Sequence, residues 1–175
     1  GKSYKGNLAL QAAATGVEGL ETIIPESPVV LWYDYYRTNG SNASQPDLGQ
    51  RASASQLFTY VETRGLSKSD TKPDAAVKER ISLYLEYIKS GEDHTNGDYN
   101  NFWDQRNVLK YADNIRCSIL LTAGLSDSNV SNTHFAKLMQ AAQDKNIVCK
   151  GFLHQVGHKY ASDYAGSDFF PKAQA

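Results

Sequence analysis

The sequence has little cysteine, no long apolar run and almost no net charge. Its two cysteines, Cys117 and Cys149, lie within apolar stretches. Free thiols in a reducing compartment are commoner there than a disulfide, although a single disulfide is the alternative. No stretch approaches the roughly 20 apolar residues of a membrane-spanning helix. The formal net charge is −1 and the basic residues are scattered, so nothing indicates binding to nucleic acid or to an anionic membrane.

Histidine is equally scarce. The chain has four histidines, and none of them pairs with another inside a predicted helix, as zinc-binding histidines do. We therefore expect neither a metal nor another cofactor. The 41% hydrophobic and 21% charged residues are typical of a globular protein, and 175 residues are enough for one domain with its own core. We expect the protein to be cytoplasmic.

The first six residues, Gly1-Lys2-Ser3-Tyr4-Lys5-Gly6, have the pattern of a nucleophile elbow. In such a turn a strand delivers a serine to a sharp bend that opens a helix. Glycines flank the serine because side chains there would collide with the neighbouring strand and helix. A serine that caps a helix in a glycine-rich loop is the alternative. Because the chain begins at this turn, we expect it to be a segment of a longer protein whose upstream strands are missing.

The rest of the chain predicts an α/β fold, because helical and strand-like apolar patterns alternate. The expected helices are 4–15, 52–64, 74–89, 102–112 and 133–144, and the expected strands are 20–24, 117–122 and 147–153. The final strand, helix and strand predict a right-handed crossover between parallel neighbours. We divide the chain into 1–37, which holds the elbow and an aromatic segment, 38–112, a helical insertion, and 113–175, which returns to the sheet.

Ser3 in the predicted elbow, and Asp127 and His158 in the loops after two predicted strands, have the chemistry of a catalytic triad. Functional loops in parallel sheets leave the carboxyl ends of the strands, so Ser3, Asp127 and His158 are expected at one edge. An imidazole can take the proton of a serine hydroxyl near neutral pH, and a carboxylate fixes the tautomer of the imidazole. The backbone N–H of Tyr4, the residue after the nucleophile, is the expected half of an oxyanion hole.

Other residues compete for the same roles. His154 ends a predicted strand, where a histidine is more often packed, so His158 in the following loop is favoured as the base. Asp127 follows a strand in the expected chain order, unlike the alternatives Asp93, Asp98 and Asp104. The remaining histidines are expected to face solvent, His134 on the exposed side of a helix and His94 in a polar loop.

An aromatic cluster occupies 29–36, with the sequence Val-Val-Leu-Trp-Tyr-Asp-Tyr-Tyr. Aromatic side chains mostly fill cores, so the cluster is either a packing plug or the wall of an apolar pocket whose phenol groups supply the few polar contacts. The residues alone leave both interpretations open.

Several blocks of sequence together resemble one family. They are Gly1-Lys2-Ser3-Tyr4-x-Gly6, Thr15-Gly16-Val17-Glu18-Gly19-Leu20, Trp32-Tyr33-x-Tyr35-Tyr36-Arg37, Gly97-Asp98-Tyr99-Asn100-x-Phe102-Trp103 with Arg106-Asn107, Gly124-Leu125-x-Asp127-x-Asn129-Val130, and Phe152-Leu153-His154-Gln155 with Gly157, His158 and Tyr160. In these blocks the chain resembles the X-prolyl dipeptidyl aminopeptidases of lactic acid bacteria, serine peptidases with the α/β-hydrolase fold. The wider family also contains acyl esterases.

The resemblance implies an α/β-hydrolase core segment that carries a helical insertion. It also implies a cytoplasmic serine exopeptidase that releases X-Pro dipeptides from peptide N-termini through an acyl-enzyme. Ser3 matches the nucleophile, Asp127 the acid and His158 the base, while Tyr4 matches the residue whose amide serves the oxyanion hole. The pocket for the proline ring is matched by Trp32, Tyr35 and Tyr36. The expected partner is a peptide with proline at its second position, and we expect the whole protein to be a homodimer.

The chain departs from the family pattern at a few positions. Lys5 replaces an apolar residue beside the elbow, and Ser128 replaces a tryptophan beside the acid. Gln50, with Asp47 close by, stands where the family has an acidic residue that pairs with the substrate's free amine. The family's tyrosine oxyanion donor belongs to upstream sequence. Two alternatives follow: an acyl esterase or acylase of the same clan, and a catalytically incomplete fragment.

Overall fold

The computed structural model describes residues 1–38, 41–42, 53–59, 62 and 73–159. The chain forms two units. One joins Gly1–Tyr35 to Asn107–Ala175, and the other is Tyr36–Arg106. The first unit has the α/β character expected from both ends of the sequence, and it contains the three residues predicted to form the triad.

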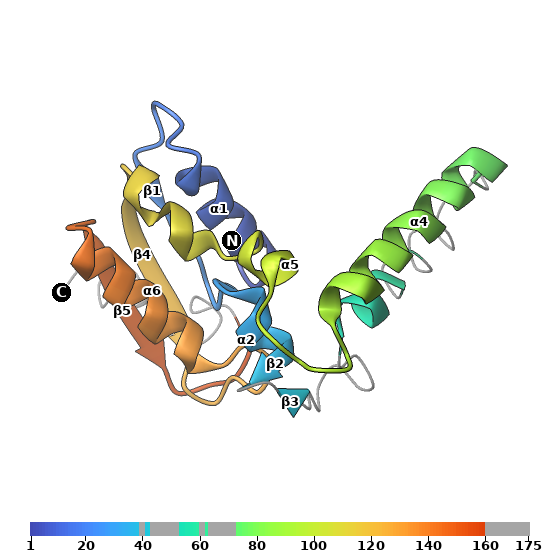
Figure 1. Ribbon diagram of the computed structural model, residues 1–175. Coiled ribbons are helices and arrows are strands. Elements are labelled where there is room, and N and C mark those ends of the chain that lie inside the picture. Colours follow the sequence, from blue (N-terminus) through green and yellow to red (C-terminus); the bar gives the residue numbers. More distant parts are fainter. Residues whose placement is uncertain (39–40, 43–52, 60–61, 63–72, 160–175) are drawn as a thin grey trace. The chain divides into compact units, whose positions relative to one another are not determined.

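A three-stranded parallel sheet forms the base of the first unit (Figure 1). Its strands, in spatial order, are β1 (Thr22–Ile23), β4 (Ser118–Gly124) and β5 (Cys149–His154). The pairing of β4 with β5 continues to Gly124 opposite His154, so both strands end at the same level. The parallel neighbours predicted from the strand–helix–strand pattern are confirmed.

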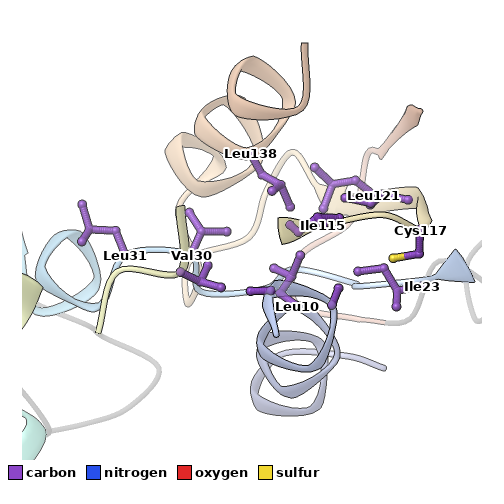
Figure 2. Packing of buried hydrophobic residues seen from close by; sticks show 12 residues of the cluster. Leu10, Ile23, Val30, Leu31, Ile115, Cys117, Leu121 and Leu138 are labelled. Carbon is purple, nitrogen blue, oxygen red and sulfur yellow. The ribbon is translucent and has the colours of Figure 1, made fainter. Parts of the chain in front are cut away.

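The core of this unit lies between the sheet and three helices, α1 (Tyr4–Ala14), the 3₁₀ helix η2 (Val108–Asn114) and α6 (Asn132–Asp144). Figure 2 shows Leu10 of α1 and Leu138 of α6 directed into a cluster that also contains Leu121 of β4. All three leucines are fully buried. Burying one leucine side chain contributes about 1.5–3 kcal/mol, so this cluster fixes the helices that carry site residues.

The second unit contains an antiparallel strand pair and helices. The strands are β2 (Arg37–Thr38) and β3 (Ser41–Asn42), and the helices are α4 (Ala75–Glu92) and α5 (Asn101–Asp104), with residues 54–59 also helical. Helix α4 begins where the sequence predicts, because the Asp74 carboxylate accepts a hydrogen bond from the Val77 N–H at 2.8 Å. The helix predicted over 52–64 falls partly outside the described residues.

The single helix predicted over 102–112 is wrong. The structure has two short helices there, α5 and η2, each started by an asparagine. Asn100 accepts from the Phe102 N–H at 2.9 Å, and Asn107 accepts from the Leu109 N–H at 3.1 Å. An asparagine side chain binds nearby backbone donors and so starts a new helix rather than continuing an old one. The break falls where the two units divide.

A buried carboxylate organises the second unit. Glu92 accepts from the N–H and the hydroxyl of Ser55, at 3.1 and 2.6 Å, and from the N–H of Ala54, at the start of the helical residues 54–59. His94 Nε2 lies 3.0 Å from Glu92 Oε2. His94 is exposed, as predicted, but it is also part of this cluster. These hydrogen bonds hold the start of the helical residues 54–59 against the end of α4, so Glu92 has a structural role.

His134 is buried, which contradicts the prediction that it faces solvent. Its exposed fraction is 1%, and the buried residues Leu138 and Ala142 follow it at steps of four along α6. His134 therefore belongs to the apolar stripe of the helix. Its Nδ1 accepts a hydrogen bond from the Val30 N–H at 3.4 Å. Burial lowers the pKa of His134 to about 4, so the side chain is neutral near neutral pH.

We predict that acidification weakens α6 through His134. The neutral side chain contributes stability above its unfolded pKa of about 6.5, and this contribution is lost as the pH falls toward the folded value of about 4. Linkage gives a loss of about 2 kcal/mol between pH 7 and pH 5. Amide hydrogen exchange of residues 132–144 in the whole protein, corrected for the intrinsic pH dependence of exchange, measures it.

The control is His134→Gln, which keeps a side chain of similar length but cannot titrate. The pH dependence of opening in α6 should largely disappear in this variant. If the variant keeps the pH dependence of the wild type, His134 is not its source.

Candidate active site

Ser3 occupies a strained turn directly before helix α1. Its backbone has φ 57° and ψ −124°, a conformation that residues other than glycine rarely adopt and that costs about 1–3 kcal/mol. Its N–H donates to the Glu26 carbonyl at 2.7 Å, and its carbonyl accepts from the Asn7 N–H at 3.0 Å. The Ser3 hydroxyl makes no capping hydrogen bond. The geometry is that of the predicted elbow and not that of the helix-cap alternative.

The glycines beside Ser3 are required by close approach of the backbone. A Cβ atom at Gly6 would lie 2.6 Å from the Gly1 carbonyl oxygen and 3.2 Å from the Glu26 carbonyl oxygen. A Cβ atom at Gly1 would lie 2.9 Å from the Lys5 carbonyl oxygen. Lys2 pairs with Glu26 in a parallel bridge, so the segment that enters the turn runs beside the end of β1. The crowding expected from the sequence is present.

Asp127 lies in the loop between β4 and α6 with its carboxylate buried. Its Oδ1 accepts from the N–H groups of Asn129 and Val130, each at 2.9 Å. Its Oδ2 lies 2.8 Å from His158 Nδ1. Burial alone would raise the pKa of this carboxyl, but the hydrogen bonds from His158 and Val130 and the charge of His158 outweigh burial and lower the pKa below its usual value. Asp127 is therefore a carboxylate near neutral pH.

His158 lies in the loop after β5, and its Nδ1 atom contacts Asp127 Oδ2. Because a carboxylate accepts, Nδ1 carries the hydrogen in this pair, which leaves the Nε2 lone pair able to take a proton. His154, the rival candidate, ends β5 and is buried. Burial lowers the pKa of His154. The structure therefore brings Asp127 together with the histidine that the sequence favours.

The two loops meet over a glycine that the sequence analysis did not single out. A Cβ atom at Gly124 would lie 2.1 Å from the Val156 carbonyl oxygen and 2.5 Å from the Gly157 carbonyl oxygen. The Leu125 N–H, next in the chain, donates to the His154 carbonyl at 2.7 Å. A glycine two residues after the predicted strand 117–122, before a loop with a candidate acid, is the signal that could have identified this contact.

The alternative acids lie in the second unit. Asp93 accepts from the Asn96 N–H at 3.1 Å, and this bond is the main reason that its pKa is lowered. Asp104 accepts from the Tyr99 hydroxyl at 3.1 Å. Asp98 is exposed. Of the four candidate acids, Asp127 is the one whose carboxylate is hydrogen-bonded to a histidine ring in the described structure.

The structure does not join Ser3, the predicted nucleophile, to His158, the predicted base. Ser3 and His158 belong to the same unit, but no hydrogen bond between the Ser3 hydroxyl and His158 is present in the described structure. Tyr4 is the first residue of α1, so its N–H has no acceptor within the helix and is available to a ligand. Its side chain is exposed.

The aromatic segment is more buried than a simple pocket wall. Trp32 and Tyr35 lie on the short helix α2 (Trp32–Tyr36) and pack edge to face, with ring centres 5.5 Å apart. Tyr35 is buried and Trp32 is half-buried. Tyr36 belongs to the second unit, where its buried ring lies 6.1 Å from that of Trp103. Packing is thus part of the role of this segment. Gln50 and Asp47, considered for amine recognition, lie outside the described residues.

The described residues contain no group of three or more metal-ligating side chains that could hold a metal ion. No helix in this part of the chain is both long and apolar enough to cross a membrane. Cys117 and Cys149 are free thiols, as the sequence analysis favours.

Comparison with known protein families shows which family this chain belongs to. The family described as X-Pro dipeptidyl-peptidase (S15 family) matches residues 1–160. The chain belongs to this family. It is 39% identical over 169 residues to the Xaa-Pro dipeptidyl-peptidase of Pediococcus pentosaceus and 38% identical over 169 residues to that of Lactiplantibacillus plantarum. Each match covers 97% of this chain and 20% of the relative. This S15 chain thus spans about a fifth of the length of the curated relatives it matches.

Solved structures share the fold at lower identity. Pyrococcus horikoshii acylaminoacyl peptidase has a TM-score of 0.56 and 16% identity, over 99% of this chain and 21% of that one. Porphyromonas gingivalis dipeptidyl peptidase 4 has a TM-score of 0.54 and 16% identity, over 99% of this chain and 18% of that one. Likeness at this identity shows the fold alone. The S15 chain is a segment of an α/β-hydrolase core, as predicted.

We predict that Gly124→Ala separates the two loops and breaks the contact between Asp127 and His158. The new methyl group would overlap backbone oxygens, which cannot move without displacing the loop. Labelling of Ser3 in the whole protein by a fluorophosphonate should slow by roughly 10²-fold or more, since His158, the predicted base, loses the carboxylate that orients it. Mass spectrometry of the labelled peptide measures the rate.

Gly151→Ala is the matched control, because it adds the same methyl group to β5. There the nearest atom is Cζ of Phe135, 2.7 Å from the new Cβ, at the far end of a side chain that can shift. Labelling should stay within about threefold of wild type. Equal slowing in both variants would contradict the loop contact over Gly124.

Proposed function

We propose that the whole protein is a serine exopeptidase that releases X-Pro dipeptides from the N-termini of peptides. The observation that carries the proposal is the pairing of Asp127 with His158 at 2.8 Å in the unit that holds Ser3 in a strained turn. Membership of the X-Pro dipeptidyl-peptidase family supports the choice of substrate.

The proposed mechanism has two half-reactions. His158 Nε2 takes the proton of the Ser3 hydroxyl while the oxygen attacks the carbonyl carbon after proline, and the N–H of Tyr4 donates to the oxyanion that forms. His158 then gives the proton to the leaving amine as the C–N bond breaks, which leaves an acyl-enzyme. A water molecule then attacks the acyl-enzyme while His158 Nε2 takes its proton. His158 returns the proton to Ser3, and the dipeptide is released with the Ser3 hydroxyl restored. Asp127 stays ionised throughout and stabilises the imidazolium in both halves.

The proposed proline pocket uses the aromatic segment. Flat, half-buried rings suit an apolar five-membered ring, and Trp32 is the half-buried member of the edge-to-face pair that it forms with Tyr35. That Tyr36 also lines the proline pocket remains a prediction from the resemblance. Recognition of the substrate's free amine is proposed for the region of Gln50 and Asp47. A cytoplasmic location and a homodimer are proposed for the whole protein on the same grounds.

We predict that the whole protein hydrolyses a chromogenic X-Pro amide with a free amine at least about 10²-fold faster than the X-Ala or the amine-blocked compound, because each discriminating contact is worth one to three powers of ten. The kcat/KM of the three compounds measures this. Equal cleavage of the blocked compound would remove the exopeptidase assignment. Preference for an acyl ester over all three amides would favour the esterase alternative.

We predict that the triad substitutions remove nearly all turnover. Ser3→Ala and His158→Ala should each lower kcat by roughly 10³-fold or more, since nucleophile and base act as a unit. His154→Gln should keep most of the activity, because His154 is buried at the end of β5 and not hydrogen-bonded to Asp127 in the described structure. Equal losses from the two histidine variants would refute the choice of base.

A further inference from the structure

Hydrogen bonds and an ion pair join the aromatic segment, residues 29–36, to α6 and to the loop that contains Asp127. The Val30 N–H donates to His134 Nδ1 at 3.4 Å, and Asp34 pairs with Lys137. The Tyr35 hydroxyl donates to Asn129 Oδ1 at 2.7 Å. The first two contacts reach helix α6, whereas the contact of Tyr35 reaches the loop that contains Asp127.

Asn129 connects Tyr35 directly to Asp127. Its side-chain oxygen accepts from Tyr35, and its backbone N–H donates to Asp127 Oδ1 at 2.9 Å. The residue is therefore fixed through both its side chain and its main chain. The carboxylate of Asp127 receives one of its two backbone donors from this fixed residue, which favours one orientation toward His158.

Tyr35 is a rigid donor. Its side chain is 7% exposed, and its ring packs edge to face against Trp32 and lies 6.5 Å from the ring of His134. A buried phenol needs a hydrogen-bond partner. The Tyr35 hydroxyl donates to Asn129 Oδ1. Replacing the hydroxyl alone keeps the ring and its packing but leaves Asn129 Oδ1 without this donor.

We infer that the Tyr35 hydroxyl is a positioning group for the catalytic acid, and that it acts through Asn129 to hold Asp127 against His158. This inference rests on the proposed function. It gives Tyr35 a role different from lining the substrate pocket. A misplaced carboxylate stabilises the imidazolium less, and the imidazolium exists only while the proton is in transfer. The loss therefore falls on kcat and on the titration of the base.

Tyr35→Phe in the whole protein tests the inference with the free-amine X-Pro amide. We expect kcat to fall by about 3- to 10-fold while KM changes by less than about twofold. The acid limb of the kcat/KM profile should move to lower pH by about 0.3–0.5 unit, because a weaker contact with Asp127 favours the imidazolium less. A raised KM and a reduced preference for proline over alanine, with the acid limb unmoved, would overturn the inference.

Tyr111→Phe is the matched control, because Tyr111 is 48% exposed on η2 and loses the same hydroxyl. It should match wild type in kcat, KM and the acid limb. Thermal unfolding compares the folding of both variants with that of the wild type.

Asn129→Ala completes a double-mutant cycle. If Tyr35 acts through Asn129, adding Tyr35→Phe to Asn129→Ala should lower kcat by less than about twofold more, because the connection is already cut. Multiplicative losses would overturn the inference. Asn129→Ala by itself should also shift the acid limb to lower pH, and an unmoved acid limb in this variant would overturn the inference even if Tyr35→Phe fails to fold.

Different measurements test the proposed activity and the role of Tyr35. Turnover of the X-Pro amide by the wild type reports on the proposed function. The ratio of variant to wild type, taken on whichever amide or ester the whole protein hydrolyses, reports on the role of Tyr35. An active wild type with an unchanged Tyr35→Phe ratio and acid limb would sink this inference and leave the proposed function standing.

Discussion

The parallel pairing of β4 with β5 is the contact on which the site depends. Because the pairing continues to Gly124 opposite His154, the chain leaves both strands at the same level, and the two following loops must pack against each other. They do so over Gly124, where backbone oxygens fill the space of a side chain. The carboxylate of Asp127 and the ring of His158 then meet at 2.8 Å. Residues far apart in the sequence are thus brought together by sheet geometry.

Two buried titratable groups of the first unit have opposite electrostatic roles. Asp127 keeps its charge, since two backbone N–H donors and a histidine offset the cost of burial. His134 loses its charge, since burial dominates there and lowers its pKa. As a neutral ring it accepts the Val30 N–H and joins the aromatic segment to α6. One of these side chains therefore stays a carboxylate that is hydrogen-bonded to His158, and the other is a neutral hydrogen-bond acceptor.

Local rules predicted the parts of this fold that depend on neighbours in the chain. The strained turn at Ser3 follows from crowding between Gly1 and Gly6, and the start of α4 follows from the cap at Asp74. The same rules failed where two tendencies compete. Apolar periodicity favours one helix over 102–112, but the asparagine cap at Asn107 divides it. The prediction that His134 lies on the exposed side of its helix is wrong, because His134 shares the buried stripe of α6 with Leu138 and Ala142.

The sequence by itself determined the residue types of the site, their order and the strand ends that carry them, because strand periodicity and turn chemistry are local. It also carried the resemblance that the family match confirms. Only the tertiary structure decided which histidine faces Asp127, why Gly124 has no side chain, and that the Tyr35 hydroxyl is used by Asn129. Those outcomes depend on distances between segments that are remote in the chain, and packing of the whole unit fixes such distances.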